Sequence, residues 1–275
     1  TAAAAALVAV LVLDSPENTA PSVAIAFAQV TATDGLVNVT RGNRERIVDA
    51  GEAFEMLVGD RISTSETGRL ALRLSAESEL RLNTETIVEI TRTQAVRLVS
   101  GMVYFDAQPQ AQGTDFSVHT DFGVVSHLGT QYAAGIDSQG LHVRVREGEA
   151  AVSDSGLFDD SVAMRVAPGE QLQIDTMGRV SRSPYSVDHP GWTWAQELAR
   201  VPDDGPLSVA DLLDWDARAT GRAVQFDSEA ARNLAEGVML NQVGGLSPAD
   251  VLGVINSTTN LEVSESGTTL NVASR

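Results

Sequence analysis

Residues 115–153 read DFSVHTDFGVVSHLGTQYAAGIDSQGLHVRVREGEAAVS. Apolar and polar residues alternate in short runs between turn residues, which predicts strands at Phe116–Thr120, Gly123–Leu128, Gln131–Ile136 and Leu141–Arg146. The alternation is clearest in the last run, where Leu141, Val143 and Val145 share one face and three polar residues share the other: His142, Arg144 and Arg146. Such a period of two is typical of half-buried antiparallel strands.

Further short strands precede and follow this stretch at a spacing of about 8–10 residues. Upstream, the pattern predicts strands within Gly35–Gly42, Gly51–Ser63, Arg69–Ser75, Glu79–Leu82, Thr86–Ile90, Ala95–Leu98 and Gly101–Asp106. Downstream, a hairpin around Pro168-Gly169-Glu170 is predicted from Leu157–Val166 and Gln171–Ile174. The fold class is therefore mainly β, with one all-β unit of short antiparallel strands in a sandwich, barrel or solenoid.

The order of residues in the central stretch resembles the core of the FecR family. The pattern is F-x-V-x-T-x-x-G-x-V-x-x-x-G-T-x-Y followed by V-x-V-x-E-G-x-A-x-V, carried by Phe116, Val118, Thr120, Gly123, Val125, Gly129, Thr130, Tyr132, Val143, Val145, Glu147, Gly148 and Val152. Upstream, Gly59 and Asp60 begin a segment that resembles the G-D-x-I-x-T opening of FecR domains. An unrelated β-sheet with glycines at its turns is the alternative.

The C-terminal region changes to helical periodicity and contains an internal repeat. Leu207–Leu213 (LSVADLL) is echoed by Leu246–Leu252 (LSPADVL) at an offset of 39 residues. Each copy predicts a Ser N-cap, an Asp at the third helical position, a Gly or Asn C-cap and a following strand. The predicted buried faces are Val209, Ala210, Leu213 and Ala217 in the first helix and Val251, Leu252 and Ile255 in the second.

The strands predicted around these helices are Ala223–Asp227, Val238–Val243, Leu261–Ser264 and Thr269–Val272. The order P-L-S-V-A-D-L-L, T-G, G-L-S-P-A-D-V-L resembles the STN domain, a small α/β signalling module of secretins and TonB-dependent transducers. FecR-like regulators often end in such a module, so the two resemblances agree in order.

The predicted domain organisation has five parts. Within residues 1–13, the run Ala2–Leu13 is uncharged and apolar and, at roughly 20 Å, is too short to span a bilayer alone. Residues 1–13 are expected to be the end of a transmembrane helix or the apolar part of a signal peptide. A linker (14–28), the all-β domain (29–180), a Pro- and Ser-rich linker (181–191) and the STN-like module (192–275) follow. Trp192 and Trp194 are expected to anchor the second linker to a domain surface.

Composition excludes several classes of function. The chain of 275 residues has a formal net charge of −18, and all 19 of its basic residues are arginines. Without a basic stripe, binding to nucleic acid is not expected, because neutralising phosphates requires clustered cations. The absence of Cys excludes disulfides, thiolate metal sites and a Cys nucleophile.

No arrangement of residues predicts catalysis, a metal or a cofactor. Of the four histidines, His119 and His142 fall on the outward face of their strands, His127 shares a face with Val125, and His189 lies in the linker. The sequence has no G-x-S-x-G elbow, no P-loop and no Rossmann fingerprint. We therefore expect no enzyme and no cofactor.

The FecR resemblance implies a periplasmic signal-transducing regulator in the bacterial inner membrane, attached by a single N-terminal helix. It implies two protein partners: the signalling domain of a TonB-dependent outer-membrane transducer and, through a cytoplasmic segment that is not in this sequence, an extracytoplasmic-function sigma factor. The alternative is a structural or glycan-binding protein of the envelope, since STN-like modules also occur in secretins.

Partner docking is expected at an edge strand of the STN-like module, because edge strands carry unpaired backbone groups. The preferred strand is formed by Val238, Met239, Leu240, Asn241, Gln242 and Val243, whose end is followed by Gly244-Gly245. The terminal strand Thr269–Val272 is the second candidate.

Overall fold

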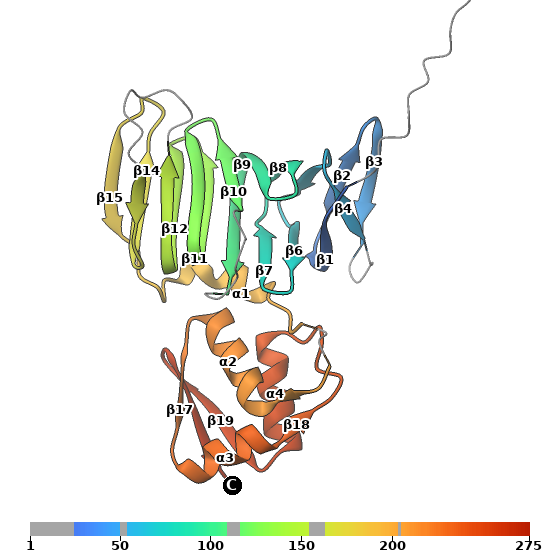
Figure 1. Ribbon diagram of the computed structural model, residues 1–275, viewed down its shortest axis with the longest axis vertical. Coiled ribbons are helices and arrows are strands. Elements are labelled where there is room, and N and C mark those ends of the chain that lie inside the picture. Colours follow the sequence, from blue (N-terminus) through green and yellow to red (C-terminus); the bar gives the residue numbers. More distant parts are fainter. Residues whose placement is uncertain (1–24, 50–53, 109–115, 154–162, 203–204) are drawn as a thin grey trace, which may run out of the picture.

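The computed structural model describes residues 25–49, 54–108, 116–153, 163–202 and 205–275. They form two modules, one above the other in Figure 1. We call Ala26–Pro184 the β module and Leu207–Ser274 the C-terminal module. Between them lie the short helices η1 (Pro190–Trp192) and α1 (Thr193–Glu197).

The β module contains fifteen strands among the described residues, all linked in one hydrogen-bonded network. They are β1 (Ala26–Asp34), β2 (Val37–Arg41), β3 (Arg44–Val48), β4 (Glu55–Leu57), β5 (Arg61–Thr64), β6 (Arg69–Ser75), β7 (Ser78–Leu82), β8 (Ile87–Arg92), β9 (Ala95–Ala107), β10 (Ser117–Thr120), β11 (Gly123–Asp137), β12 (Gly140–Ser153), β13 (Met164–Val166), β14 (Glu170–Ile174) and β15 (Val180–Pro184). The predicted mainly-β class is confirmed.

The long strands β9, β11 and β12 change partners part-way along and so belong to two layers. The first half of β9 pairs with β8 and β10, and its second half pairs with β7 and β11. Similarly, β12 pairs with β14 near its start and with β13 near its end. Strands that switch sheets do so at bends and bulges. In β9 and β12 the changes lie near Gly101 and Gly148, whose φ angles of 84° and 72° suit glycine.

The main core lies between these layers, since apolar side chains from both halves of each long strand join one cluster. From β9 it contains Val96 and Leu98 of the first half and Val103 and Phe105 of the second. In β12, residues of Leu141–Val145 are alternately buried and half-buried, as the sequence predicts. The hydrophobic contribution of such fully buried side chains is about 1.5–3 kcal/mol each.

Two predicted strand breaks are wrong. Gln131–Ile136 continues from Gly123–Leu128 as the single strand β11, with a shift of register between Leu128 and Gln131. Likewise, the two strands predicted within 95–106 are one strand, β9. Gly129, which suggested a turn, lies where the continuous strand β11 shifts its register.

The predicted linker 181–191 begins inside a strand, which is a second correction. Strand β15 pairs with β14 over Val180–Pro184, and all of its residues are exposed. Without a buried face it has no apolar alternation from which a strand could be predicted. Pro184 is tolerated because β15 is an edge strand, where one N–H group can be lost.

The C-terminal module has helices on one face of a small sheet. Its elements are β16 (Leu207–Ser208), α2 (Val209–Thr220), β17 (Ala223–Phe226), α3 (Glu229–Gly237), β18 (Met239–Leu240), α4 (Pro248–Thr258), β19 (Leu261–Ser266) and β20 (Thr269–Ser274). The sheet order is β17-β20-β19, and β16 pairs separately with β18. The second core cluster fills the space between helices and sheet.

The predicted repeat is present in both helix N-termini. Ser208 and Ser247 each accept a hydrogen bond from the backbone of an Asp three residues later, and that Asp accepts one in return, so each helix begins with a capping box. The C-termini differ. Gly221 is left-handed after α2, whereas the residue that caps α4 is Thr259 in an extended conformation, so the predicted Asn C-cap is wrong.

The predicted membrane segment Thr1–Leu13 lies outside the described residues. Within the described part of the chain, no helix has the length and apolar character needed to cross a bilayer.

Candidate functional site at the module junction

The C-terminal end of α2 is held by side chains of the β module and α1. A helix leaves its last carbonyl groups without partners inside the helix. Here the carbonyl of Arg218 accepts from Gln131 Nε2 (3.1 Å), and that of Thr220 accepts from Gln196 Nε2 (2.9 Å). The carbonyl between them, of Ala219, accepts from Arg146 Nη1 (3.2 Å). Three successive carbonyls of α2 are therefore satisfied across the junction.

Arg146 is buried at this junction, although its place in the alternation predicted an outward side chain. Its Nε donates to the carbonyl of Val187 (3.2 Å), and its guanidinium lies 5.9 Å from the ring centre of Trp192. A cation at a helix C-terminus is favourable because that end carries partial negative charge. Gly221 allows this approach, since a Cβ there would lie 1.9 Å from Arg146 Nη2, and its φ of 71° also suits glycine.

Arg218 extends the junction through ion pairs. Its Nη2 donates to Asp106 Oδ1 (2.7 Å) and to the carbonyl of Ala107 (2.8 Å), and its Nη1 pairs with Glu147. Burial acts to lower the pKa of Arg218, but the two carboxylates outweigh it and raise the pKa above its ordinary value. Arg218 therefore stays charged while it joins α2 to β9 and β12.

A second buried arginine, Arg81, joins β7 to helix α1. Its Nη1 donates to the carbonyl of Ala195 (2.9 Å) and its Nε to Glu79 (2.8 Å), while Asp106 lies 3.9 Å away. Burial acts to lower the pKa of Arg81, and Glu79 and Asp106 outweigh it. Asp106 thus lies between Arg81 of the β module and Arg218 of α2.

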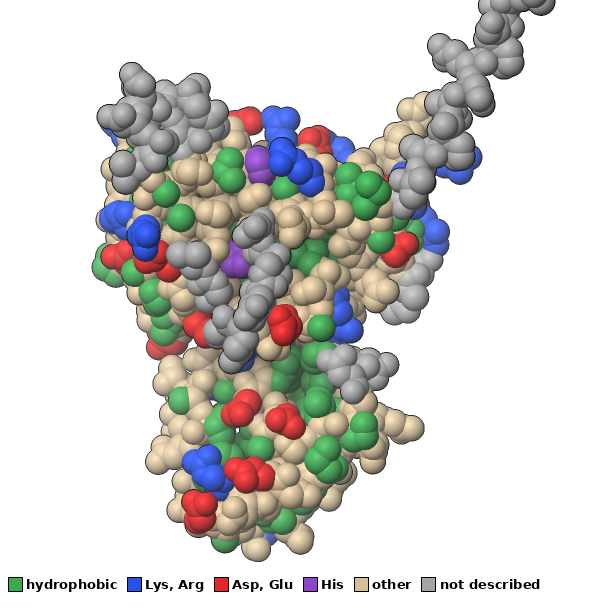
Figure 2. All heavy atoms as spheres, in the orientation of Figure 1, with side chains coloured by type: hydrophobic (Ala, Val, Ile, Leu, Met, Phe, Trp, Pro, Cys, Tyr) green, Lys and Arg blue, Asp and Glu red, His purple; other side chains and the backbone are tan. Residues whose placement is uncertain are grey.

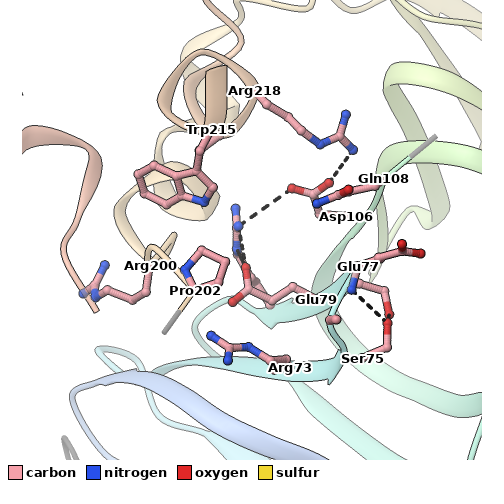
Figure 3. A pocket seen from close by; sticks show the side chains of 14 residues that line it. Arg73, Ser75, Glu77, Glu79, Asp106, Gln108, Arg200, Pro202, Trp215 and Arg218 are labelled. Carbon is pink, nitrogen blue, oxygen red and sulfur yellow. Dashed lines mark hydrogen bonds and ion pairs between the residues drawn. The ribbon is translucent and has the colours of Figure 1, made fainter. Parts of the chain in front are cut away.

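These ion pairs line one wall of a cleft between the modules (Figure 3). The cleft encloses about 80 Å3. Arg73 of β6 lines it from the β module, and Arg200, Pro202 and Trp215 line it from the other side. Because its walls come from both modules, relative movement of the modules would change its width.

Two tryptophans attach the connecting helices to the outer face of the β module, as the sequence predicts. Trp192 is 1% exposed and packs edge-on against Tyr104 at 5.8 Å between ring centres, and Trp194 does so at 6.4 Å. Burial raises the pKa of Tyr104 to about 12. Removal of such a buried aromatic side chain typically costs about 3–5 kcal/mol.

Asp216, in the middle of α2, is a buried carboxylate. Neither of its oxygens has a hydrogen-bond partner among the described residues, and the residue is fully buried. Burial raises its pKa to about 7; Arg222 opposes this shift and Glu265 adds to it. The carboxyl group is therefore partly protonated near neutral pH.

The predicted family-motif residues build the β module. Asp60 is buried and accepts two hydrogen bonds from Arg41, at 2.7 and 2.8 Å, and one from the backbone of Leu57. Gly59, with φ of 96°, turns the chain into this position. Phe116 stacks on Phe105 at 4.7 Å between ring centres.

The other motif residues act at turns, in the core and at bends. Thr120 donates to the carbonyl of Gly123 across the β10–β11 turn, and Val118 is fully buried. At the bend of β11, beside Gly129, Thr130 donates to the carbonyl of Glu149 (2.8 Å). Gly148 lies at the matching bend of β12, and Glu147 contacts the C-terminal module through Arg218.

The predicted docking strand Val238–Val243 is shorter than expected. Only Met239 and Leu240 pair, with β16, and Gln242 has a φ of 57°, which ends the extended conformation. Val243 is buried in the module core, whereas Met239 is 53% exposed. The six residues therefore form no continuous edge, and their role in docking stays a prediction.

The second predicted docking strand does not lie at an edge of the sheet. Thr269–Val272 lies in β20, which pairs with β17 on one side and β19 on the other. A terminal strand can be central in a sheet because sequence order does not decide spatial order.

The histidines do not converge. Within the described residues, no group of three or more His, Cys, Asp or Glu side chains could hold a metal ion. His142 pairs with Asp137 (3.1 Å), His119 contacts Ser117 (3.0 Å), and the ring of His127 packs 4.4 Å from Phe105. The expected absence of enzymatic activity stays a prediction.

Sequence reasoning missed the polar residues that build the junction: Arg81, Gln131, Arg146, Asp216 and Arg218. Their strand and helix patterns place polar residues opposite apolar ones, which ordinarily means solvent exposure. A possible signal was Gly221, because a left-handed glycine at a helix end permits the close approach of another segment.

Comparisons with known proteins identify one part of the chain. Residues 60–151 match the family model described as FecR protein, which confirms the resemblance seen in the motif residues. This match ends before the C-terminal module, whose resemblance to an STN domain stays a prediction. No curated protein matches the sequence.

Two crystal structures of a candidate anti-sigma factor from Parabacteroides distasonis ATCC 8503 are similar to this chain. One has 18% sequence identity and a TM-score of 0.40, and covers 78% of this chain and 98% of its own. The other has 16% identity and a TM-score of 0.41, and covers 78% and 99%.

Proposed function

Because this chain carries a FecR domain at residues 60–151, we propose that it is part of a regulator that controls a sigma factor. The family match is the observation that carries the proposal. The domain is built as a framework, since its motif residues fill the core, pair the strands and shape the bends. A framework of this kind suits a protein that transmits binding events and does not itself bind a small substrate.

The finer form of the proposal places the regulator in the bacterial inner membrane with the described residues in the periplasm. In this form, the apolar segment Thr1–Leu13 is the end of the membrane helix. The C-terminal module receives the signalling domain of a TonB-dependent outer-membrane transducer. A cytoplasmic segment of the regulator then binds an extracytoplasmic-function sigma factor. Support comes from the apolar run and from the STN-like order of the C-terminal module.

The junction provides a physical route between the two modules. The C-terminal end of α2 is bound by the β module through Gln131, Arg146 and the pairs of Arg218. A partner that displaces α2 would have to break these contacts or carry the β module with it. The ion pairs of Arg218 are partly buried, so they are screened less by salt than surface pairs.

A transcription reporter tests the proposal in cells. The full gene that encodes this chain is deleted and restored, and transcription from a promoter of the associated sigma factor is measured with and without inducer. We expect that transcription no longer responds to the inducer after the deletion, and that the wild-type gene restores this response. Transcription that responds normally without the gene would contradict the regulatory role.

A matched pair of variants then tests the junction. Arg218→Ala removes ion pairs between the modules, whereas Arg222→Ala removes a pair with Glu265 inside the C-terminal module. We expect Arg218→Ala to change the induction ratio by at least about fivefold and Arg222→Ala to leave it within about twofold, because residues that share one ion-pair network typically have coupling energies of about 0.5–3 kcal/mol. Equal effects would show that the junction does not transmit the signal.

A further inference from the structure

The three-stranded sheet of the C-terminal module has two outer strands, β17 and β19. In a β-ladder, backbone groups of alternate residues point to opposite edges, so an outer strand leaves half of its N–H and C=O groups on its outer side. Whether such an edge can accept another strand depends on what covers these groups.

The outer edge of β19 is closed by α4 and the residue that follows it. Asn256 Nδ2 donates to the carbonyl of Val263 (2.9 Å), and its Oδ1 accepts from the N–H of Val263 (2.7 Å). The N–H of Leu261 donates to Thr259 Oγ1 (3.1 Å). The amide of Asn256 thus occupies the position that an added strand would take.

The outer edge of β17 is open. The N–H of Ala223 donates to the carbonyl of Thr268, which directly precedes β20, at 2.8 Å, and the N–H of Asp227 donates to the carbonyl of Val272 in β20, at 2.9 Å. In a parallel ladder this places the N–H and C=O groups of Val224 and Phe226 on the outer side. Among the described residues β17 pairs with β20 alone, and Figure 1 shows it at the outer margin of the module.

We propose that β17 binds an extended strand of a partner protein, and that this strand carries basic side chains. Backbone hydrogen bonds to Val224 and Phe226 would supply the pairing. The exposed side chains of Ala223 and Gln225 are small or neutral, so the solvent face of β17 offers no steric or charged barrier.

Charge favours a basic partner over a second copy of this chain. Residues 192–275 contain twelve acidic residues and five arginines, and the whole chain has a net charge of −18. Figure 2 shows acidic side chains exceeding basic ones on the visible face of the C-terminal module. At the ends of β17, Arg222 pairs with Glu265 and Arg232 stacks on Phe226, while Asp227 is exposed. A basic strand is attracted to this module, and another copy is repelled.

A backbone substitution tests the edge without changing its charge. Val224→Pro removes an outward N–H, which an edge strand tolerates, and Val224→Thr keeps this group with a side chain of similar shape. The probe is a short capped peptide of alternating Lys and Val, titrated into the whole chain and followed by amide NMR shifts. We expect the largest shifts at Val224 and Phe226, with affinity reduced at least about tenfold by Val224→Pro and retained by Val224→Thr.

Further measurements keep the result decisive if Val224→Pro perturbs the fold. Methylation of the same peptide on alternate backbone nitrogens removes the N–H donors along one of its two edges. We therefore expect its binding to wild-type protein to be lost when the methylated edge faces β17. A Glu–Val peptide should not bind. Asn256→Ala, which uncovers β19, should create a second set of shifts at Val263.

Four outcomes would overturn the proposal. The first is no binding of the Lys–Val peptide, and the second is a set of amide shifts that covers acidic residues but not β17. The third is equal binding whichever edge of the peptide is methylated, and the fourth is a dimer in sedimentation that Val224→Pro dissociates. The last outcome would assign the edge to a second copy. A transducer's signalling domain is one possible source of the strand, but the peptide experiment does not depend on it. Failure of the reporter experiment above therefore leaves this result unaffected, and the reverse also holds.

Discussion

Replacement of Asp216 by Asn should increase the stability of the C-terminal module at neutral and alkaline pH but not in acid. Burial raises the pKa of Asp216 to about 7, compared with 3.8 for the unperturbed group. Between these values the unfolded chain has released its proton while the folded chain keeps it. The free energy of unfolding therefore falls as pH rises through this window and is level above it.

The difference of about three pH units corresponds to at most about 4 kcal/mol, at 1.36 kcal/mol per unit. Asn has nearly the same shape as Asp and stays neutral at every pH. Like the protonated carboxyl group, it leaves a buried polar group without a partner, so near pH 4 the two proteins should have similar stability. Near pH 8 we expect Asp216→Asn to be more stable by about 2–4 kcal/mol.

Native-state hydrogen exchange measures this for individual core amides of the module, such as those of Leu213 and Ile255, over this pH range. The difference between wild-type and variant isolates Asp216, since the other titrating groups are common to both proteins. Glu236→Gln on the exposed side of α3 controls for the change in net charge. A stability difference that does not vary with pH would refute the reasoning.

Three further substitutions test other parts of the fold. Gly221→Ala introduces a Cβ against Arg146 at a left-handed position and should destabilise the junction by about 1–3 kcal/mol. The measurement is the rate of proteolysis between the modules, which should increase; an unchanged rate would contradict the packing described. Trp192→Ala should lower the free energy of unfolding, measured in urea, by about 3–5 kcal/mol. The control Met177→Ala, at a 77% exposed site, should change this free energy by less than about 0.5 kcal/mol. Similar values for both variants would be inconsistent with Trp192 as an anchor. Ser247→Ala removes one capping box and should cost about 1 kcal/mol, measured by exchange of amides in α4, and no loss would argue against the cap.

The sequence alone determined the features that depend on neighbouring residues. Alternation over Leu141–Val145 predicted a half-buried strand, because each side chain of a strand faces opposite to the next. The capping boxes at Ser208 and Ser247 predicted where two helices begin, because their hydrogen bonds close within one turn. The family motif was recognisable for the same reason, since its bends and turns are local.

Tertiary structure alone decided where each strand changes layer, which edges are open and which polar side chains are buried. Gly129 suggested a turn because glycine permits both a turn and a bend, and only the pairing of distant strands distinguishes them. Arg146 follows the polar side of its alternation, yet it is buried because α2, more than 70 residues later in the chain, ends against it. The same holds for β17 and β19, whose edges differ because Asn256 and Thr259 bind the outward backbone groups of β19. Backbone alternation specifies the face of a strand, but what lies against that face is set by segments far away in sequence.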